Sequence, residues 1–218
     1  MKIGGVNTLS LSDYPGKVAA VVFTHGCNFK CPFCHNGSLI PDHVSRDLLI
    51  DEEYLFEFLR YRSNQLEGVV VSGGEPTIHR ELPGFLRKIK EAGFAVKLDT
   101  NGSRPEMIKM ILAGKLVDYI AMDIKAPLDK YKQLVGYPFV PNGTESIEES
   151  IALIAQSGID HAFRTTVVEA LLSPEDMRKI RVLVPAGSNY TLQKFCPENA
   201  FDPKLRKRSN LYLGSPQL

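Results

Sequence analysis

The chain has 218 residues, of which 44% are hydrophobic and 23% are charged, and its formal net charge at pH 7 is +1. This length allows one substantial α/β domain and is short for two well-packed ones. The near-neutral charge provides no basic field of the kind that nucleic-acid binders use, and no apolar run approaches the roughly 20 residues that span a bilayer. We therefore expect a cytoplasmic protein with no nucleic-acid partner and no membrane partner.

Residues 1–16 combine short apolar stretches with turn formers, and a turn at 13–16 leads into the first predicted strand. From there, apolar runs typical of buried strands alternate with segments of helical periodicity. Capping signals such as Asp51 before a helix and Gly93 after one separate the elements. In chain order the sequence predicts a strand at 17–24, a helix at 52–62, a strand at 68–72, a helix at 81–92, a strand at 94–100, a helix at 105–112, a strand at 117–124, helices at 128–134 and 146–157, a strand at 162–168, a helix at 174–183 and a strand at 190–195.

Strands that alternate with helices in this way imply a parallel sheet with right-handed crossovers. The predicted fold class is α/β, a partial (βα)6 TIM-like barrel, because a closed barrel of this class needs eight strands. Residues 1–196 form this domain in the prediction. Residues 197–218 form a C-terminal tail with basic side chains between Lys204 and Arg208, which we expect to be loosely ordered or to contact a partner.

Cys27, Cys31 and Cys34 directly follow the first predicted strand in the spacing C-x3-C-x2-C. Closely spaced thiols in a chain without a secretion signal are more often metal ligands or redox groups than disulfides. A structural zinc site would need a fourth ligand, such as a neighbouring histidine or the distant Cys196. A 4Fe-4S cluster held by three cysteines would leave one iron open for an exogenous ligand. The number of thiols alone does not distinguish these two metal sites.

Chemically distinctive motifs end the next predicted strands, at 73–75 (Gly-Gly-Glu), 99–102 (Asp-Thr-Asn-Gly) and 123–125 (Asp-Ile-Lys). Because a parallel sheet gathers its carboxyl ends at one edge, we expect these motifs to share a site, which Arg164 of the fifth strand joins if its register is favourable. The glycines would let a ligand approach the backbone, and the charges would pair with an amino-acid ligand. The alternatives are plain turns and an ion pair of Asp99 or Asp123 with Lys125.

The cysteine motif, with Phe33 before its third cysteine, resembles the signature of the radical S-adenosylmethionine enzymes, C-x3-C-x-aromatic-C. The surrounding text, Ser-Leu-Ser-Asp-Tyr-Pro-Gly-Lys at 10–17 and Gly-Cys-Asn-Phe-Lys-Cys-Pro-Phe-Cys-His-Asn at 26–36, is similar to the glycyl-radical-enzyme activases. Within that group it is most similar to the anaerobic ribonucleoside-triphosphate reductase activating proteins, and pyruvate formate-lyase activating enzyme is a near relative. The resemblance covers almost the whole chain.

The resemblance implies two cofactors, a 4Fe-4S cluster and S-adenosylmethionine. The cluster would be held by the three cysteines of the motif, which are then both catalytic and metal-binding. The residues that the resemblance implies as cofactor-binding are Phe33, His35, Gly74, Glu75, Asp99, Asn101, Asp123, Lys125 and Arg164.

More specific roles are implied for some of these residues. Gly74 and Glu75 would receive the amino group of the methionyl moiety of S-adenosylmethionine, and Lys125 would meet its carboxylate. Oxygen ligands suit a hard monovalent cation, and a site of this kind in the family matches Asp99, Thr100 and Asp123.

The activity implied is reductive cleavage of S-adenosylmethionine and formation of a glycyl radical on a partner enzyme, anaerobic ribonucleoside-triphosphate reductase. A flavodoxin- or ferredoxin-type protein would donate the electron. Three alternatives stand beside it. The first is an activase of pyruvate formate-lyase or another glycyl radical enzyme. The second is a compact radical enzyme acting on a small molecule, similar to 7-carboxy-7-deazaguanine synthase, and the third is a zinc-stabilised or electron-carrying binding protein without turnover.

Overall fold

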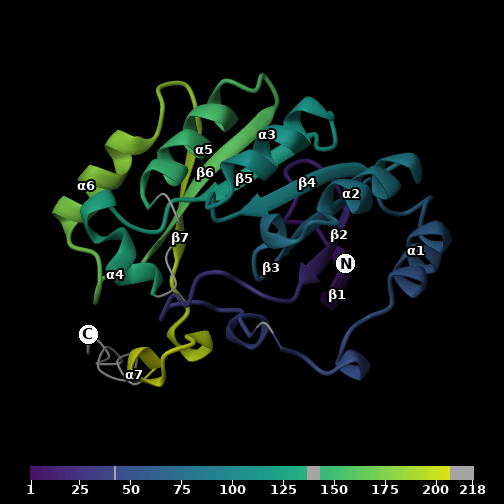
Figure 1. Ribbon diagram of the computed structural model, residues 1–218, viewed down its shortest axis with the longest axis horizontal. Coiled ribbons are helices and arrows are strands. Elements are labelled where there is room, and N and C mark those ends of the chain that lie inside the picture. Colours follow the sequence, from purple (N-terminus) through teal and green to yellow (C-terminus); the bar gives the residue numbers. More distant parts are fainter. Residues whose placement is uncertain (42, 137–142, 207–218) are drawn as a thin grey trace, which may run out of the picture.

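The structure is a computed structural model that describes residues 1–41, 43–136 and 143–206. Its centre is a seven-stranded sheet in which the strands follow one another in chain order (Figure 1). β1 pairs antiparallel with β2, and every later pair of neighbours is parallel. The strands are β1 Ile3–Ser10, β2 Ala19–Thr24, β3 Gly68–Gly73, β4 Ala95–Thr100, β5 Tyr119–Asp123, β6 Asp160–Val167 and β7 Asn189–Lys194.

Helices connect successive parallel strands and pack on the outer face of the curved sheet (Figure 1). Amphipathic spacing explains their orientation, because α2 buries Leu82, Phe85, Leu86 and Ile89 on one face. The predicted helices are all present, with small differences at their ends. The helices are α1 Glu52–Tyr61, α2 Leu82–Glu91, α3 Pro105–Ala113, α4 Tyr131–Val135, α5 Glu145–Ala155, α6 Pro174–Leu183 and α7 Pro203–Arg206.

The strand side chains alternate between two differently filled faces. Val69 joins the large apolar core under the helices, whereas Val70 belongs to a second cluster on the other face with Tyr14. The Tyr14 and Tyr119 ring centroids are 6.0 Å apart, and a Cβ added to Gly68, at the start of β3, would lie 2.9 Å from the Tyr14 ring. These rings therefore fill the inner face at the amino ends of the strands, and the polar strand ends lie at the opposite, carboxyl edge.

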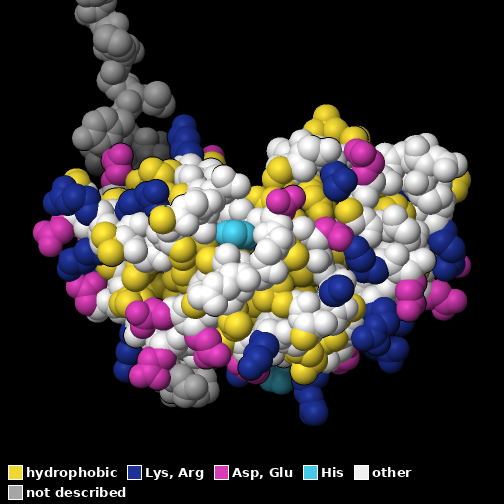
Figure 2. Space-filling model, turned by 90° about the horizontal axis from the view of Figure 1, so that it is seen from above, with side chains coloured by type: hydrophobic (Ala, Val, Ile, Leu, Met, Phe, Trp, Pro, Cys, Tyr) yellow, Lys and Arg dark blue, Asp and Glu magenta, His cyan; other side chains and the backbone are white. Residues whose placement is uncertain are grey.

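The prediction of a partial TIM-like barrel is confirmed. Six of the seven strands in the sheet, β2 to β7, run parallel, and the two edge strands are β1 and β7. Lysine, arginine, aspartate and glutamate side chains are interspersed on the face shown in Figure 2. None of the helices in the described ranges has both the length and the apolar content that a membrane crossing demands.

The amino-terminal strand β1 was not expected from the sequence. Residues 1–16 were predicted as short stretches with turns, yet Ile3–Ser10 pairs with β2, with register shifts between Ile3 and Gly5 and between Asn7 and Ser10. Glycines and polar residues interrupt any alternation of apolar side chains here, so the sequence carries no strand signal. Antiparallel pairing with the mostly apolar β2 supplies the structure. The turn at 13–16 is present, and the Lys17 N–H donates to the Tyr14 carbonyl at 3.2 Å.

The first part of the C-terminal tail, which was predicted to be loosely ordered or to contact a partner, is folded. Residues 203–206 form α7, and the Asp202 N–H donates to the Pro32 carbonyl at 2.8 Å. Ala200 is fully buried. This segment therefore packs on the cysteine loop. The predicted basic residues Lys207 and Arg208, and most of the loop predicted at 137–144, lie outside the described residues.

Candidate active site

The cysteine loop begins at the carboxyl end of β2 and is held mainly by backbone hydrogen bonds. The Gly26 N–H donates to the Leu39 carbonyl at 2.8 Å, and the Lys30 N–H donates to the Val135 carbonyl at 2.7 Å. Phe29 is buried and anchors the middle of the loop. All three thiols are free, with Cys31 buried and its two neighbours in the motif partly buried. The loop thus presents three free thiols at the edge where the strands end.

Every site residue predicted from the sequence lines one cavity of about 360 Å³ at this edge. The structure therefore brings together residues that are far apart in the chain, including Arg164, whose contribution depended on register. The roles of these residues remain predictions. The predicted residues around the cavity are Cys27, Cys31, Phe33, Cys34, His35, Gly74, Glu75, Asp99, Thr100, Asn101, Asp123, Lys125 and Arg164. Cys196 is not among the lining residues.

Burial dominates the protonation of the thiols. It raises the pKa of Cys27 to about 12 and that of Cys31 to about 12, and it also raises the pKa of Cys34. Lys125 acts in the opposite direction on all three thiols. Since metals bind the thiolate, loading of the site with metal would release protons.

An alternating row of charged side chains crosses β4, β5 and β6 beside the thiols. Lys97 forms an ion pair with Asp99 on the same strand. Arg164 bridges two carboxylates, with its Nη1 3.4 Å from Asp99 Oδ2 and its Nε 2.8 Å from Asp123 Oδ1. Lys125 Nζ lies 3.3 Å from Asp123 Oδ2. Three cations thus face two carboxylates in this row.

The row bears on the ion-pair alternative given above for these residues. The ion pair of Asp123 with Lys125, given above as the alternative, is present, whereas Asp99 pairs with Lys97 and Arg164. The guanidinium of Arg164 lies between the two carboxylates that were predicted to hold a monovalent cation. The cation site stays a prediction.

Partners in the row set the charge states. Burial alone would raise the pKa of Asp123, but Arg164 and Lys125 outweigh it and lower that pKa to about 2. Burial likewise disfavours the charged form of Lys125, yet Asp123 outweighs burial and raises the pKa of that ammonium. Lys125 therefore remains a cation in the cavity at every physiological pH.

The low pKa of Asp123 predicts a pH-dependent contribution to stability. Because its folded-state pKa lies below its ordinary value of 3.8, its stabilisation is complete above that value and is lost as pH falls toward about 2. Chemical denaturation of wild type and Asp123→Asn should give a difference in unfolding free energy that is constant above pH 5 and shrinks below about pH 4. The exposed Asp160→Asn is the control. A difference that grows on acidification would contradict this assignment.

Glu75 ties the ends of β3 and β4 together from a buried position. Its Oε1 accepts from the Thr77 N–H at 3.1 Å and the Thr100 hydroxyl at 2.8 Å, and its Oε2 accepts from the Asn101 N–H at 2.7 Å. The side chain is almost fully buried, which raises its pKa although these hydrogen bonds act to lower it. The carboxylate thus shapes the cavity wall, and its predicted contact with an amino group remains untested.

Gly74 is required by close backbone approach. A Cβ at this position would lie 2.0 Å from the Gly26 carbonyl oxygen, at the start of the cysteine loop. Gly74→Ala should therefore displace that loop, and a shift of about 1 Å is expected to lower, about 100-fold, the S-adenosylmethionine cleavage that the resemblance implies. Gly84→Ala is the matched control, because a Cβ there meets nothing within 4 Å. It should leave cleavage unchanged and stabilise α2 by about 0.5–1 kcal/mol. Equal cleavage by both variants would contradict the steric role.

His35 joins the cysteine loop to the segment after β7. Its Nε2 accepts from the Cys196 N–H at 3.1 Å, and its ring stacks on Phe195 with centroids 5.6 Å apart. Burial lowers the pKa of His35, which favours the neutral form that can accept this hydrogen bond. His35 therefore helps to shape the cysteine loop and also lines the cavity.

Sequence reasoning missed two residues, Lys97 and Ser72, that hold Asp99 in place. Lys97, which is almost fully buried, pairs with Asp99, and the Ser72 hydroxyl donates to Asp99 at 3.1 Å. One signal was available, since Lys97 and Asp99 are two residues apart on a predicted strand and so face the same side. The hydrogen bond from Ser72 to Asp99 joins β3 to β4, and no sequence pattern predicts such a pair.

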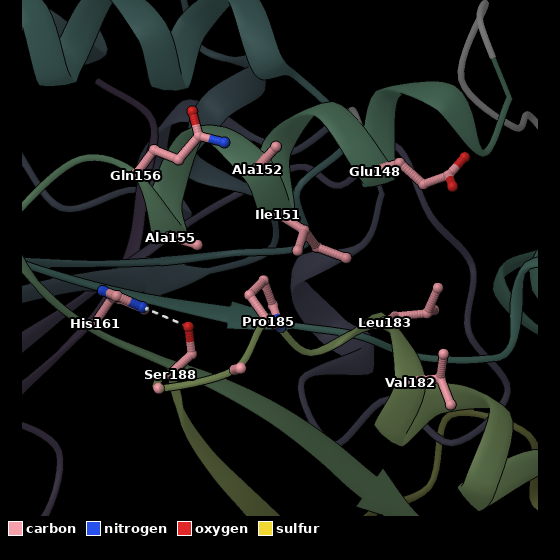
Figure 3. Close-up of a pocket in the computed structure, with 12 residues that line it drawn as sticks. Glu148, Ile151, Ala152, Ala155, Gln156, His161, Val182, Leu183, Pro185 and Ser188 are labelled. Atoms are coloured by element: carbon pink, nitrogen blue, oxygen red, sulfur yellow. Dashed lines mark hydrogen bonds between the residues drawn. The ribbon is translucent and has the colours of Figure 1, made fainter.

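A second cavity, of about 650 Å³, lies between α5, α6 and the loop before β7 (Figure 3). Its lining combines small and apolar side chains such as Ala152 and Pro185 with the polar side chains of Glu148 and Gln156. His161 is its one imidazole, and its ring nitrogens contact the Ile159 carbonyl and the Ser188 hydroxyl, each at 3.0 Å. Its larger volume does not make it the better candidate, because it lacks the free thiols and the charged row of the cavity at the strand ends.

The predicted cofactors fit the donor set of the first cavity. Three free thiols are the ligands that iron-sulfur clusters use, Lys125 supplies a cation for a carboxylate, and Gly74 leaves room beside the backbone. Among the described residues no three or more His, Cys, Asp or Glu side chains already converge as a metal site. The fit therefore rests on the chemistry of the side chains and on their common cavity.

Comparisons with known proteins agree with this chemistry. The model of the Radical SAM superfamily matches residues 21–183. A Methanocaldococcus jannaschii protein assigned as a glycyl-radical enzyme activating enzyme is 36% identical over 213 residues, which cover 94% of this chain and 84% of the relative. The pyruvate formate-lyase-activating enzyme of Clostridium pasteurianum is 27% identical over 215 residues, covering 96% of this chain and 87% of that protein.

Solved structures show the same fold. Streptococcus suis SuiB bound to precursor peptide SuiA superposes with a TM-score of 0.62 at 13% identity, over 81% of this chain and 38% of that chain. TYW1 with a lysine-pyruvate adduct gives a TM-score of 0.55 at 16% identity, over 76% and 60% of the two chains. Sequence match, shared fold and the thiol-lined cavity together lead to one assignment: the chain belongs to the radical SAM superfamily and, within it, to the glycyl-radical enzyme activating enzymes.

Proposed function

We propose that this protein cleaves S-adenosylmethionine reductively at a 4Fe-4S cluster on Cys27, Cys31 and Cys34 and thereby generates a glycyl radical on anaerobic ribonucleoside-triphosphate reductase. The observation that carries the proposal is the single cavity that unites these thiols with Lys125 and the row of charged residues. When bound, the cluster supplies one electron that splits S-adenosylmethionine into methionine and a 5′-deoxyadenosyl radical, which removes hydrogen from a glycine Cα.

The role of this chain's own residues is to bind and orient S-adenosylmethionine. The ammonium of Lys125 stays charged and faces the cavity, so it can pair with the methionyl carboxylate. Asp99, held by Lys97 and Ser72, offers an oxygen to an amino group or a ribose hydroxyl. Gly74 allows a polar group to approach the backbone. Phe33, which is buried in the cavity wall, provides an apolar surface for the adenine.

A protein substrate suits the incomplete barrel. The sheet ends at β1 on one side and β7 on the other, so these edge strands do not pair to close it. Thr166 and Gln193, from the last two strands, line the cavity next to that opening. A loop of a partner enzyme can therefore reach the reacting atoms from the side. The electron would come from a flavodoxin- or ferredoxin-type donor.

Electron paramagnetic resonance on the anaerobically reconstituted protein tests the function. Incubation with S-adenosylmethionine, a flavodoxin reductant and anaerobic ribonucleotide reductase should give a glycyl radical signal on the reductase. A parallel sample contains pyruvate formate-lyase instead. A signal on pyruvate formate-lyase alone would refute the proposed partner, and no signal with any glycyl radical enzyme would refute the activase function itself.

A further inference from the structure

Hydrogen bonds made by side-chain amides join the cysteine loop to the turn that follows β4. Asn28, the residue after Cys27, accepts from Asn101 Nδ2 at 3.0 Å through its Oδ1 and donates to Ser103 Oγ at 2.8 Å through its Nδ2. The Ser103 N–H in turn donates to Asn101 Oδ1 at 2.9 Å. The side chains of Asn28, Asn101 and Ser103, together with the Ser103 backbone N–H, thus form a closed ring of hydrogen bonds between two walls of the active-site cavity. None of these bonds has a part in the function proposed above.

The turn at 101–103 is the fixed side of this ring. Asn101 is 4% and Ser103 is 2% exposed. The Asn101 N–H donates to Glu75 Oε2 at 2.7 Å, and the Gly102 carbonyl accepts from the Ser150 hydroxyl at 2.7 Å. Gly102 has φ of +74°, which favours glycine. Because the turn makes so many buried contacts, it cannot shift independently of its surroundings. The turn therefore restrains the position of Asn28.

The cysteine loop is the side that needs support near its first thiol. Cys27 is tied to its surroundings by its own N–H, which donates to the Ile40 carbonyl at 3.2 Å, and by a weak contact of the Phe29 N–H with its sulfur at 3.4 Å. Asn28 is the next residue, and its side chain is only partly buried. The Asn28 side-chain amide adds two hydrogen bonds that connect this part of the loop to Asn101 and Ser103 across the cavity edge.

We propose that Asn28 is a positioning residue that fixes the distance between the Cys27 thiol and the cavity wall formed by Asn101. The proposal rests on the proposed function, in which metal at the thiols and S-adenosylmethionine along the Asn101 wall must meet. Reacting groups need to be placed within fractions of an ångström, and a misplacement of about 1 Å can cost a factor of 100. Asn28 acts through its neighbours, since it does not line the cavity.

Two substitutions separate positioning from folding. Asn28→Ala removes both bonds from the loop side, and Ser103→Ala removes one of them from the turn side without altering the loop. Asn64→Ala, at an exposed position after α1, is the matched control. Each protein is reconstituted anaerobically, and iron content, thermal stability and the dissociation constant for S-adenosylmethionine are measured. The spectrum of the dithionite-reduced cluster is recorded by electron paramagnetic resonance with and without S-adenosylmethionine.

Asn28→Ala should keep the iron content of wild type but bind S-adenosylmethionine about 10-fold more weakly, as expected for a supporting residue next to a metal ligand. The spectral change on adding S-adenosylmethionine should be smaller than in wild type. Ser103→Ala should show the same effects more weakly, and the double variant should be no worse than Asn28→Ala, because both belong to one ring. Unchanged affinity and spectrum, with or without a lower melting temperature, would overturn the proposal. The hydrogen bonds of Asn28 would then contribute to folding alone.

The experiment also separates this proposal from the proposed function, because it needs no partner enzyme. Failure of wild type to bind S-adenosylmethionine at its iron-loaded site would refute the proposed function. Normal binding by wild type and equally tight binding by Asn28→Ala would refute only the role of Asn28.

Discussion

Replacing Cys31 with alanine is expected to abolish the bound iron and sulfide and to reduce S-adenosylmethionine cleavage to the background seen without protein. Cys31 is the most buried thiol of the motif, and with it removed only two cavity thiols remain to hold a cluster. Iron and sulfide content after anaerobic purification and the yield of 5′-deoxyadenosine measure the effect.

Cys196→Ala is the control for this substitution. Its thiol lies outside the cavity wall, although its backbone N–H bonds to His35. It should retain cluster and cleavage at the level of wild type. If Cys196→Ala also lost its iron, the cluster would have four protein ligands. The vacant coordination position that the chemistry requires would then be missing.

The second large effect is expected at Asp99. Asp99→Ala would remove the carboxylate that pairs with the ammonium of Lys97, whose side chain is 4% exposed. Breaking a buried pair from one side typically costs about 3–5 kcal/mol, since the remaining charge cannot be solvated. For a chain of this size this corresponds to a fall in melting temperature of about 10 °C. Differential scanning calorimetry of the cofactor-free protein measures it.

The chain offers a matched pair of controls. Asp129 forms an ion pair with Lys179 at 2.8 Å, but both side chains are about half exposed. Asp129→Ala should therefore cost less than about 1 kcal/mol. The double variant Asp99→Ala with Lys97→Met should recover part of the lost stability, because it removes the stranded charge. Equal losses of stability in Asp99→Ala and Asp129→Ala would contradict the claim that burial makes the Asp99–Lys97 ion pair costly to break.

The sequence predicted the parallel part of the fold because its local signals and its tertiary structure agree. β2 and β3 are continuous apolar runs, as expected for strands covered on both faces, and α6 begins with a capping box at Ser173. β1 was missed because its structure depends on its neighbour: Gly4, Gly5 and Asn7 carry no strand pattern. The folded tail up to Arg206 likewise depends on contacts with the cysteine loop.

The residues of the candidate site could be predicted from the sequence, but the contacts between them could not. Chemically distinctive residues at strand ends converge in any parallel sheet, so Asp99, Asp123 and Lys125 could be placed together from their positions alone. The partners of each side chain could not be predicted, because they depend on register and on side-chain direction. Arg164 thus emerged as a bridge between two carboxylates, and Glu75 as a buried tie between two strand ends.

The most direct test of the central claim is to reconstitute the protein with iron and sulfide under anaerobic conditions, add S-adenosylmethionine and dithionite, and quantify the products. Equimolar methionine and 5′-deoxyadenosine, formed by wild type and lost in the variants of Cys27, Cys31 and Cys34, are the predicted result. Zinc in place of iron after anaerobic purification, with no cleavage of S-adenosylmethionine, would contradict it.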